Sequence, residues 1–390
     1  SLPLAAAGAG VMGVAVSSMH YTAMAASRIT MVPDSANHAQ APIPVSLLWA
    51  GRGAGVTEPL RGALAERIDI ARAVRDLSRL GVASLENPGR RFQVHRLVQQ
   101  IMREELAEDR RESALHNARA LVAAANPGSP DSQDTWRRHA ELGPHMRAVG
   151  LIEGGLDERR AALDHLGYVY TIGDYEGARD LALEYLAVLR RPADEGGVAE
   201  ADPLLLLTRR RYADALRSLG DFAAAREEGR RVADDMREML GEEHVYTLGA
   251  LIGVGADLRV AGEFTAAREL DEHNLALHRR VLGESDQSTI RSMLVLGIDY
   301  RMDGDSAGAL AIDLEVERLS TRALGETDAM TLHAVCGQAR DLHGLGRYRE
   351  ALELLRDRAP AFAATLGADH PLVLSADSIV AILLRRLGRF

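Results

Sequence analysis

The strongest constraint on this chain is a repeat of 42 residues in its second half. A marker glycine returns with this spacing, a Leu-Gly pair returns in register with it, and an alanine follows the marker by five residues. Two ladders that keep register over four periods predict a tandem array of one structural unit. The marker glycines are Gly220, Gly262, Gly304, Gly346 and Gly388, and the glycines of the Leu-Gly pairs are Gly241, Gly283, Gly325 and Gly367.

Each period has the length of two helices. In the second period the spacing predicts one helix over residues 246–259, closed by Gly262, and another over residues 265–281. Leu248 and Leu251 lie at helical spacing on one face of the first of these helices. Such a pair cannot bury its apolar faces alone, so the units are expected to stack into a right-handed superhelix with a concave groove.

The repeats resemble the tetratricopeptide repeat, in the 42-residue form of kinesin light chains, over residues 161–390. An imperfect early copy lies at Gly173. Ser306 stands where this family has an aromatic residue, so we expect that repeat to be looser. The chain ends at Phe390 at the start of a second helix, which predicts an incomplete last repeat.

Composition excludes several classes of function. Arginine supplies all 46 basic residues, so a Walker A lysine and a Schiff-base lysine are both excluded within this sequence. The single cysteine, Cys336, excludes a disulfide framework, and the net charge of −10 predicts no bulk attraction to nucleic acid. No metalloprotease or dinucleotide motif is present. We therefore expect neither an enzyme nor a cofactor.

The first helix of each repeat carries a row of basic residues. In the tetratricopeptide family fixed positions of these helices line the groove, and guanidinium groups along such a wall suit carboxylates. The resemblance thus implies a protein or peptide partner that is acidic or has a free C-terminal carboxylate. The predicted groove residues are Arg217, Arg259, Arg291, Arg301, His333, Arg340, His343 and Arg385.

An alternative interpretation of this row is a solvated helix face. In that case the arginines pair with aspartates and glutamates of neighbouring repeats. Self-association through Leu383, Leu384 and Leu387 of the last helix is a further alternative for the array. Cys336 lies on the same lining and is assigned no role.

Residues 41–110 have a different pattern. A helical stretch at 68–80 is followed by an apolar run at 82–85, an Asn-Pro-Gly turn, a second run at 92–95 and a helix at 96–106. This order of helix, hairpin and helix predicts a winged-helix-like subdomain. The fold class is therefore all-α: a tetratricopeptide superhelix preceded by a winged-helix-like subdomain with a short β-hairpin, the two joined by a helical connector at residues 111–160.

The run from Phe92 to Gln99 resembles the end of the switch module in NB-ARC/STAND regulatory ATPases. The resemblance implies that His95 matches a histidine that touches bound ADP, whereas Val94 and Arg96 depart from its neighbours, and no NTPase module is present in this sequence. The order of elements over residues 41–390 is also similar to the tetratricopeptide proteins of FxSxx-COOH systems. These resemblances imply an interaction or sensor arm of a signalling regulator. The C-terminal part of a nucleotide-gated switch is an alternative.

DNA binding by the winged helix is a competing interpretation. Four acidic residues crowd the helix after the hairpin, where they would repel phosphates. They are Glu104, Glu105, Glu108 and Asp109. We therefore expect no nucleic-acid partner.

The first 27 residues contain no charged side chain. Residues 19–26 resemble the signature of the MHYT membrane sensor domain, which implies soft copper ligands at Met19, His20 and Met24. Such a stretch is long enough for one membrane span, but its alanines and glycines make it weakly hydrophobic. We expect residues 1–40 to be a fragment of that domain and the protein to be cytoplasmic. A membrane-tethered sensor is the alternative.

Overall fold

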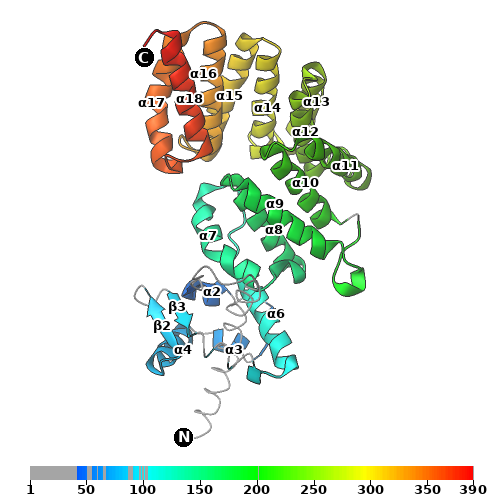
Figure 1. Cartoon of the computed structure of the whole chain (residues 1–390), viewed down its shortest axis with the longest axis vertical. Coiled ribbons are helices and arrows are strands. Elements are labelled where there is room, and N and C mark those ends of the chain that lie inside the picture. The colour runs from blue at the N-terminus through cyan, green and yellow to red at the C-terminus, as the bar shows by residue number, and fades with distance from the viewer. Residues whose placement is uncertain are drawn as a thin grey trace. The chain divides into compact units, whose positions relative to one another are not determined.

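The computed structural model describes residues 42–389 except 51–54, 59, 65–66, 87–90, 96–97, 99–100, 102–103 and 201 (Figure 1). The predicted MHYT-like segment, with Met19, His20 and Met24, lies outside the described residues. The chain divides into two compact units. One extends to Tyr168 and includes Ala187–Gly197, and the other consists of Val169–Leu186 and the residues from Val198 onward.

The first unit begins with a small antiparallel sheet. Its strands have the order β1-β3-β2, and Phe92 of β3 pairs with Ile43 on one side and with Leu85 on the other. Phe92 is fully buried, so the sheet packs its apolar face inward. The elements of this unit are β1 (Ile43–Pro44), α2 (Val45–Ala50), α3 (Leu60–Leu64), α4 (Arg67–Arg79), β2 (Ala83–Glu86), β3 (Arg91–Val94), α6 (Glu108–Ala124), α7 (Gln133–Ala148) and α8 (Leu156–Thr171).

The predicted helix and hairpin before the repeats are confirmed. Helix α4 covers the stretch expected at 68–80, and β2 and β3 pair over the two apolar runs. Strand β1 was not predicted, because two residues are too few to show an alternating pattern. The mostly helical fold class is therefore confirmed, with a sheet of three strands rather than a hairpin of two.

The second unit is an array of helix pairs, which Figure 1 shows as successive helices from α10 to α18. From α11 onward, the second helices have 19 residues and the first helices have 16. The helices are α9 (Tyr175–Leu189), α10 (Pro203–Ser218), α11 (Phe222–Leu240), α12 (Val245–Val260), α13 (Phe264–Leu282), α14 (Gln287–Met302), α15 (Ser306–Leu324), α16 (Ala329–Gly344), α17 (Tyr348–Leu366) and α18 (Pro371–Arg386).

Both glycine ladders end helices. Gly262 has φ 79° and Gly283 has φ 87°, and the other glycines of the two ladders also have positive φ. This left-handed conformation is open to glycine at little cost and stops a helix at a fixed residue. The next helix often starts on a capping aspartate, such as Asp286, which accepts a hydrogen bond from Ser288 N at 2.8 Å. The predicted helix boundaries are thus confirmed to within one residue.

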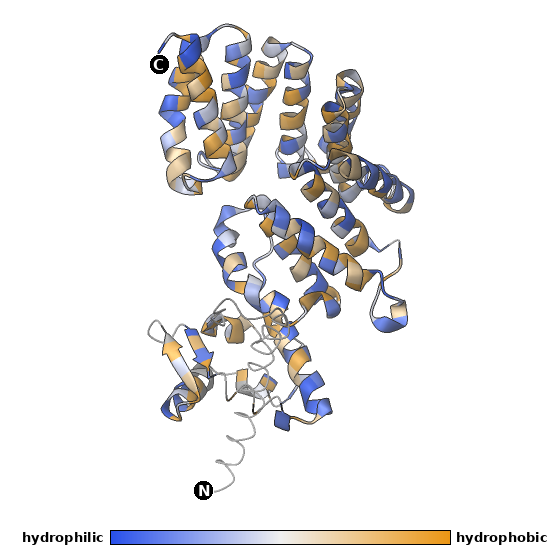
Figure 2. Cartoon of the chain, in the orientation of Figure 1, coloured by the Kyte–Doolittle hydropathy of each residue, from blue (hydrophilic) through white to orange (hydrophobic). Residues whose placement is uncertain are grey.

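The core of the array lies between neighbouring helices, whose hydrophobic and hydrophilic faces are visible in Figure 2. The alanine ladder, which includes Ala267 and Ala309, is fully buried, so the helices approach closely there. Leu383 is also fully buried, in a cluster formed by α16, α17 and α18, and it is not part of an exposed apolar face. Helix α15 starts at Ser306 with Asp305 as its cap and has the same length as α13, so its regular form does not support the looser repeat expected there.

Candidate functional site

Three arginines of the predicted row bind aspartates of the next repeat. Each donates to a carboxylate that lies 40 residues further along the chain, on the first helix of the following pair. The contacts are Arg217 Nε to Asp257 Oδ1 at 2.6 Å, Arg259 Nη1 to Asp299 Oδ1 at 2.9 Å and Arg301 Nε to Asp341 Oδ1 at 2.5 Å. We call these three ion pairs the arginine ladder. They are the pairing between repeats that the alternative interpretation of the row describes.

Each member of the ladder holds a second carboxyl group, which for Arg217 is Asp214 of its own helix and for the other two comes from the second helix of the pair. Arg259 also donates to Asp271 Oδ2 at 2.5 Å, and Arg301 donates to Asp313 Oδ2 at 2.6 Å. The latter two aspartates are buried, whereas the side chain of Arg301 keeps 18% exposure. Arg259 and Arg301 therefore each face two buried carboxyl groups with a single positive charge.

This imbalance changes the protonation of the aspartates. Burial raises the pKa of Asp271 to about 7 against the opposing effect of Arg259, and the neighbouring Asp299 raises it further. Burial likewise raises the pKa of Asp313 to about 8, with a contribution from Asp341. A raised pKa means that the carboxyl group stays protonated at a higher pH. Near neutral pH we therefore expect each pair of aspartates to share a proton.

Glycines make room for the second carboxyl group. A Cβ atom on Gly255 would lie 2.6 Å from Asp271 Oδ2, and one on Gly297 would lie 2.9 Å from Asp313 Oδ1. A Cβ atom on Gly337 would also collide with Asp313. These glycines of the first helices thus make room for a polar side chain from the second helix.

The arginine ladder ends before the last helix pair. His343 occupies the position of the arginines, and its ring lies 5.2 Å from that of Tyr348. The positions of the two aspartates hold Leu355 and Leu383, both fully buried. All three polar groups of the ladder are therefore replaced together in the last repeat.

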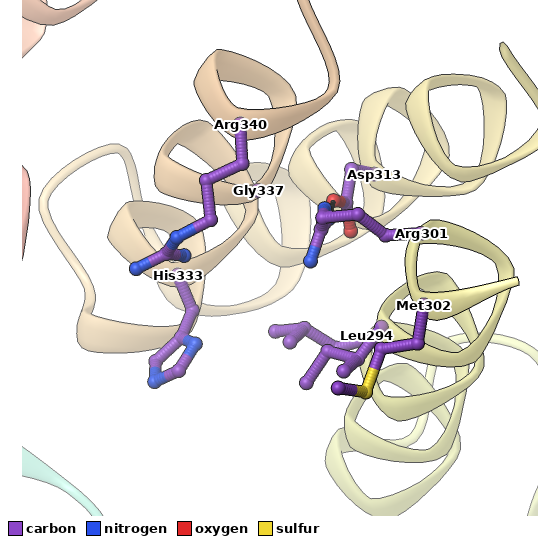
Figure 3. A pocket seen from close by; sticks show the side chains of 8 residues that line it. Leu294, Arg301, Met302, Asp313, His333, Gly337 and Arg340 are labelled. Atoms are coloured by element: carbon purple, nitrogen blue, oxygen red, sulfur yellow. Dashed lines mark hydrogen bonds and ion pairs between the residues drawn. The ribbon is translucent and has the colours of Figure 1, made fainter. Parts of the chain in front are cut away.

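A hollow of about 400 Å³ opens between α14 and α16. Figure 3 shows Arg340 and His333 projecting from α16, with Leu294 and Met302 across the hollow and Arg301 beside Asp313. Three predicted groove residues, Arg301, His333 and Arg340, thus line one cavity. We call it the α14–α16 hollow. Its lining consists of Leu294, Ile298, Arg301, Met302, Asp313, His333, Gly337 and Arg340.

Arg340 differs from the ladder arginines. Its guanidinium donates to the hydroxyl of Ser375 at 2.8 Å, and no carboxylate of the described residues lies within ion-pair distance of it. Burial lowers the pKa of Arg340, because the surrounding helices desolvate its charge. Asp313 and Asp341 offset part of this effect from a distance. A desolvated guanidinium whose hydrogen-bond partner is a hydroxyl favours a further anion.

His333 is a neutral neighbour of this cation. Desolvation inside the hollow, followed by the positive charges of Arg340 and Arg291, lowers its pKa. The ring is nevertheless accessible to solvent. At neutral pH its nitrogens can therefore donate to or accept from a ligand without adding charge.

The other predicted site residues lie elsewhere. Arg385 is exposed on α18, and His343 packs on Tyr348. His95 follows β3, where its backbone N–H donates to Val82 O at 2.9 Å and its side chain is exposed. Cys336 is buried, and burial raises the pKa of its thiol to about 11, so it is not a nucleophile at neutral pH.

The aspartates that pair with the ladder arginines were not predicted from the sequence, nor was the apolar side of the hollow. Asp257, Asp299 and Asp341 recur at 42 residues and could have been found as a third ladder. Nothing in the sequence marked Leu294 or Met302 as accessible to a ligand.

Among the described residues no group of three or more metal-ligating side chains is present. No helix in the described part of the chain has both the length and the apolarity that a membrane crossing requires.

Comparison with known proteins agrees with the repeat. Residues 246–322 match the tetratricopeptide repeat family. No curated protein sequence matches the chain.

Several solved structures are similar to parts of the chain. A putative kinesin light chain of Podosopora anserina with nearly identical TPR-like repeats is 21% identical over 53% of this chain and 95% of its own, with a TM-score of 0.41. BtubC of P. vanneervenii is 18% identical over 63% of this chain and 91% of its own, with a TM-score of 0.42. A STAND signal transduction ATPase with a tetratricopeptide repeat sensor, from Pyrococcus horikoshii, is 14% identical over 89% of this chain and 60% of its own, with a TM-score of 0.43. Similarities this low do not indicate a ligand.

Proposed function

We propose that the helix-pair array is a scaffold that binds a protein or peptide, and that the α14–α16 hollow receives a carboxylate of that ligand. The observation that carries the proposal is the half-buried guanidinium of Arg340, which donates to a hydroxyl and forms no ion pair with a carboxylate of the described residues. A carboxylate supplies both the opposite charge and the acceptors that a guanidinium fork prefers.

The ladder arginines have a different role in this proposal. Arg217 and Arg259 hold neighbouring repeats together, and their side chains are 14% and 10% exposed. Binding of a ligand to them would require separating charge pairs whose carboxylates are buried, which is costly. Selectivity for carboxylates is therefore assigned to Arg340, with His333 as a neutral polar neighbour.

The apolar side of the hollow defines the rest of the ligand. Leu294, Ile298 and Met302 face the cavity, and Met302 is 47% exposed. A ligand that places an apolar group there gains hydrophobic burial beside its charge. A peptide with an apolar C-terminal residue meets both requirements, because its carboxylate and its side chain leave the same carbon atom.

The role of the array in a larger system is proposed as the interaction arm of a signalling regulator. The support is the order of elements, in which a helix and a small sheet precede the repeats. This order is similar to that of the tetratricopeptide proteins of FxSxx-COOH systems, and the run from Phe92 to Gln99 resembles the switch module of NB-ARC/STAND regulators.

Binding to the 390-residue chain can be measured by fluorescence anisotropy with N-terminally labelled peptides. The peptides would end in apolar or acidic residues and would carry either a free carboxylate or an amide. We expect saturable binding of the free acids and about a tenfold loss or more in Arg340→Gln, because a hydrogen bond to a charged group contributes about 1.5–3 kcal/mol.

The matched control is Arg318→Gln on α15, an exposed arginine that is paired with Glu315. It removes the same charge from the chain outside the hollow, and its affinity should equal that of the wild type. Equal losses in both variants, or no binding of any peptide, would contradict the proposal.

A further inference from the structure

The wall of the α14–α16 hollow contains an acid of its own. Asp313 lines the cavity and accepts a hydrogen bond from Arg301, which also binds Asp341. A carboxylate that enters the hollow therefore approaches a site where two carboxyl groups already share one guanidinium. Three negative charges around Arg301 and Arg340 would repel one another in a poorly solvated space.

The charges around Asp313 come from four helices. Arg301 faces it from α14, and Asp341 and Arg340 face it from α16. On its own helix Glu317 lies one turn further, where it accepts from Gln338 at 2.6 Å and pairs with Arg358 of α17 at 3.0 Å. The charge of Glu317 is thus already balanced by Arg358. The protonation state that can change in this wall is therefore that of Asp313 and Asp341.

We infer that a carboxylate ligand and a proton occupy this hollow together, and that the proton is held between Asp313 and Asp341 beside Arg301. The inference rests on the proposed function, since it concerns the ligand of the same hollow. When the proton is bound, the wall presents one negatively charged carboxylate to the incoming ligand instead of two. When the proton is absent, both aspartates are charged and repel the ligand carboxylate, and the charge of Arg301 is already neutralised by them.

The protonation behaviour of the pair supports this coupling. Burial raises the pKa of Asp313 to about 8, so the free protein loses this proton at mildly alkaline pH. A ligand carboxylate nearby adds negative charge and raises the pKa of Asp313 further in the complex. Proton binding and ligand binding are linked, so the ligand in turn binds more tightly to the protonated protein. The affinity for the ligand therefore falls as rising pH removes this proton from the free protein.

His333 does not produce the same effect in this range. Desolvation and the two arginines lower its pKa, so it is neutral throughout the mildly alkaline range. A peptide with an acetylated N-terminus, no histidine and one C-terminal carboxylate contributes no titrating group either. In the interval from pH 6.5 to pH 9 the remaining groups with shifted pKa values are the aspartates beside Arg301 and those beside Arg259, which the variants below separate.

The test measures the affinity of the full chain for such a peptide across this interval. In the wild type we expect affinity to fall with rising pH, approaching about tenfold per pH unit at the steepest part. Isothermal titration in buffers of different ionisation enthalpy should show proton uptake that rises from near zero at pH 6.5 toward one proton at pH 9.

Two variants separate the hollow from the ladder. Asp313→Asn has the shape of the protonated acid and should bind with an affinity that is independent of pH. Asp271→Asn changes the same kind of group beside Arg259, outside the lining of the hollow, and should keep the wild-type dependence. Asp341→Asn replaces Asp313→Asn if thermal unfolding shows that the latter is not folded.

The outcomes are distinguishable. Wild-type binding without pH dependence, or a wild-type slope in Asp313→Asn, would overturn the coupled proton and leave the carboxylate site standing. Loss of the pH dependence of affinity in Asp271→Asn would also overturn the coupled proton, because that dependence would then not be specific to the aspartates of the hollow. Absence of binding at every pH would overturn the proposed function and this inference together.

Discussion

The repeats of α12 to α15 and the last repeat, which begins with α16, fill the same positions between their helices with different side chains. The former have ion pairs there, and the latter has apolar residues. In the former, Arg259 and Arg301 each join two buried carboxyl groups from neighbouring helices. In the latter, the corresponding positions are His343, Leu355 and Leu383, with both leucines fully buried. The helices have the same lengths in both regions. Stacking of this unit therefore does not require the ion pairs.

The difference indicates what the arginine ladder contributes. Replacing a buried ion network by apolar residues of similar size is often neutral or stabilising, whereas removing one partner is strongly destabilising. The ladder is thus better explained by where it puts charge than by added stability. At the α14–α16 hollow it places a carboxyl pair in the lining of the cavity that we propose binds a ligand, and the apolar repeat has no such pair.

The largest expected effect comes from removing one arginine of the ladder. Arg259→Met leaves Asp271 and Asp299 buried without a cation, and we expect it to lower the free energy of unfolding by about 3–5 kcal/mol at pH 8. At pH 5 the loss should be smaller, because the carboxyl groups can then take up protons. Urea unfolding followed by circular dichroism measures both values.

The control for this variant is His343→Met, which introduces the same residue at the same repeat position in the apolar repeat. It strands no charge, and we expect a much smaller loss. Equal losses in the two variants would show that the position, and not the charge network, determines stability.

The next effect is the pH dependence of stability. The pKa values of Asp271 and Asp313 are raised, to about 7 and about 8, from an ordinary value of 3.8. At these aspartates the folded state therefore binds more protons than the unfolded state between those limits, so their contribution to stability should fall as pH rises from about 4 to about 8. Buried histidines such as His145, His165 and His333, whose pKa desolvation lowers to about 4, contribute in the opposite direction below about pH 6.5. Each aspartate pair contributes at most about 1.4 kcal/mol per pH unit.

The double variant Asp271→Asn and Asp313→Asn should flatten this dependence while keeping the fold. Thermal unfolding at pH 5, 6.5 and 8 measures the difference between the variant and the wild type. An identical pH dependence in the variant and the wild type would mean that the carboxyl pairs are fully ionised when folded.

A smaller effect is expected where a glycine makes room for the aspartate. Gly255→Ala forces Asp271 to move, and overpacking of this kind costs about 1–3 kcal/mol. The apolar repeat has Ala339 at this position, opposite Leu355. Ala339→Gly should cost about 1 kcal/mol through helix propensity alone. A Gly255→Ala variant more stable than the wild type in urea would contradict the crowding.

The smallest effect belongs to an exposed ion pair, also between an arginine and a carboxylate. Arg318 donates to Glu315 at 2.6 Å on the surface of α15, one turn apart on the same helix. Such pairs are screened by solvent, so Arg318→Ala should leave the urea midpoint unchanged within error. A loss comparable to that of Arg259→Met would remove the distinction between buried and exposed pairs.

The glycine ladders allowed much of the fold to be predicted. Gly262 and Gly283 end helices in the left-handed conformation, so their spacing predicted helix boundaries to within a residue. Strand β1 could not be predicted, because its two residues pair with a strand 48 positions away, and such pairing leaves no local pattern.

The site was predictable only in part. The basic row located Arg301, His333 and Arg340. Arg301 pairs with two carboxyl groups whereas Arg340 donates to the hydroxyl of Ser375, and a sequence does not display these partners. Aspartates are common on helix faces, so Asp313 had no distinguishing mark until α14 and α16 were seen to enclose it.

The central claim is that Arg340 holds a ligand carboxylate. The most direct measurement is a cycle of four affinities, in which one peptide is titrated as free acid and as C-terminal amide into the wild-type chain and into Arg340→Gln. We expect amidation to weaken binding to the wild type about tenfold or more and to have little effect on the variant, since the two changes remove the same contact. Equal effects of amidation on both proteins would show that the carboxylate is bound elsewhere or not at all.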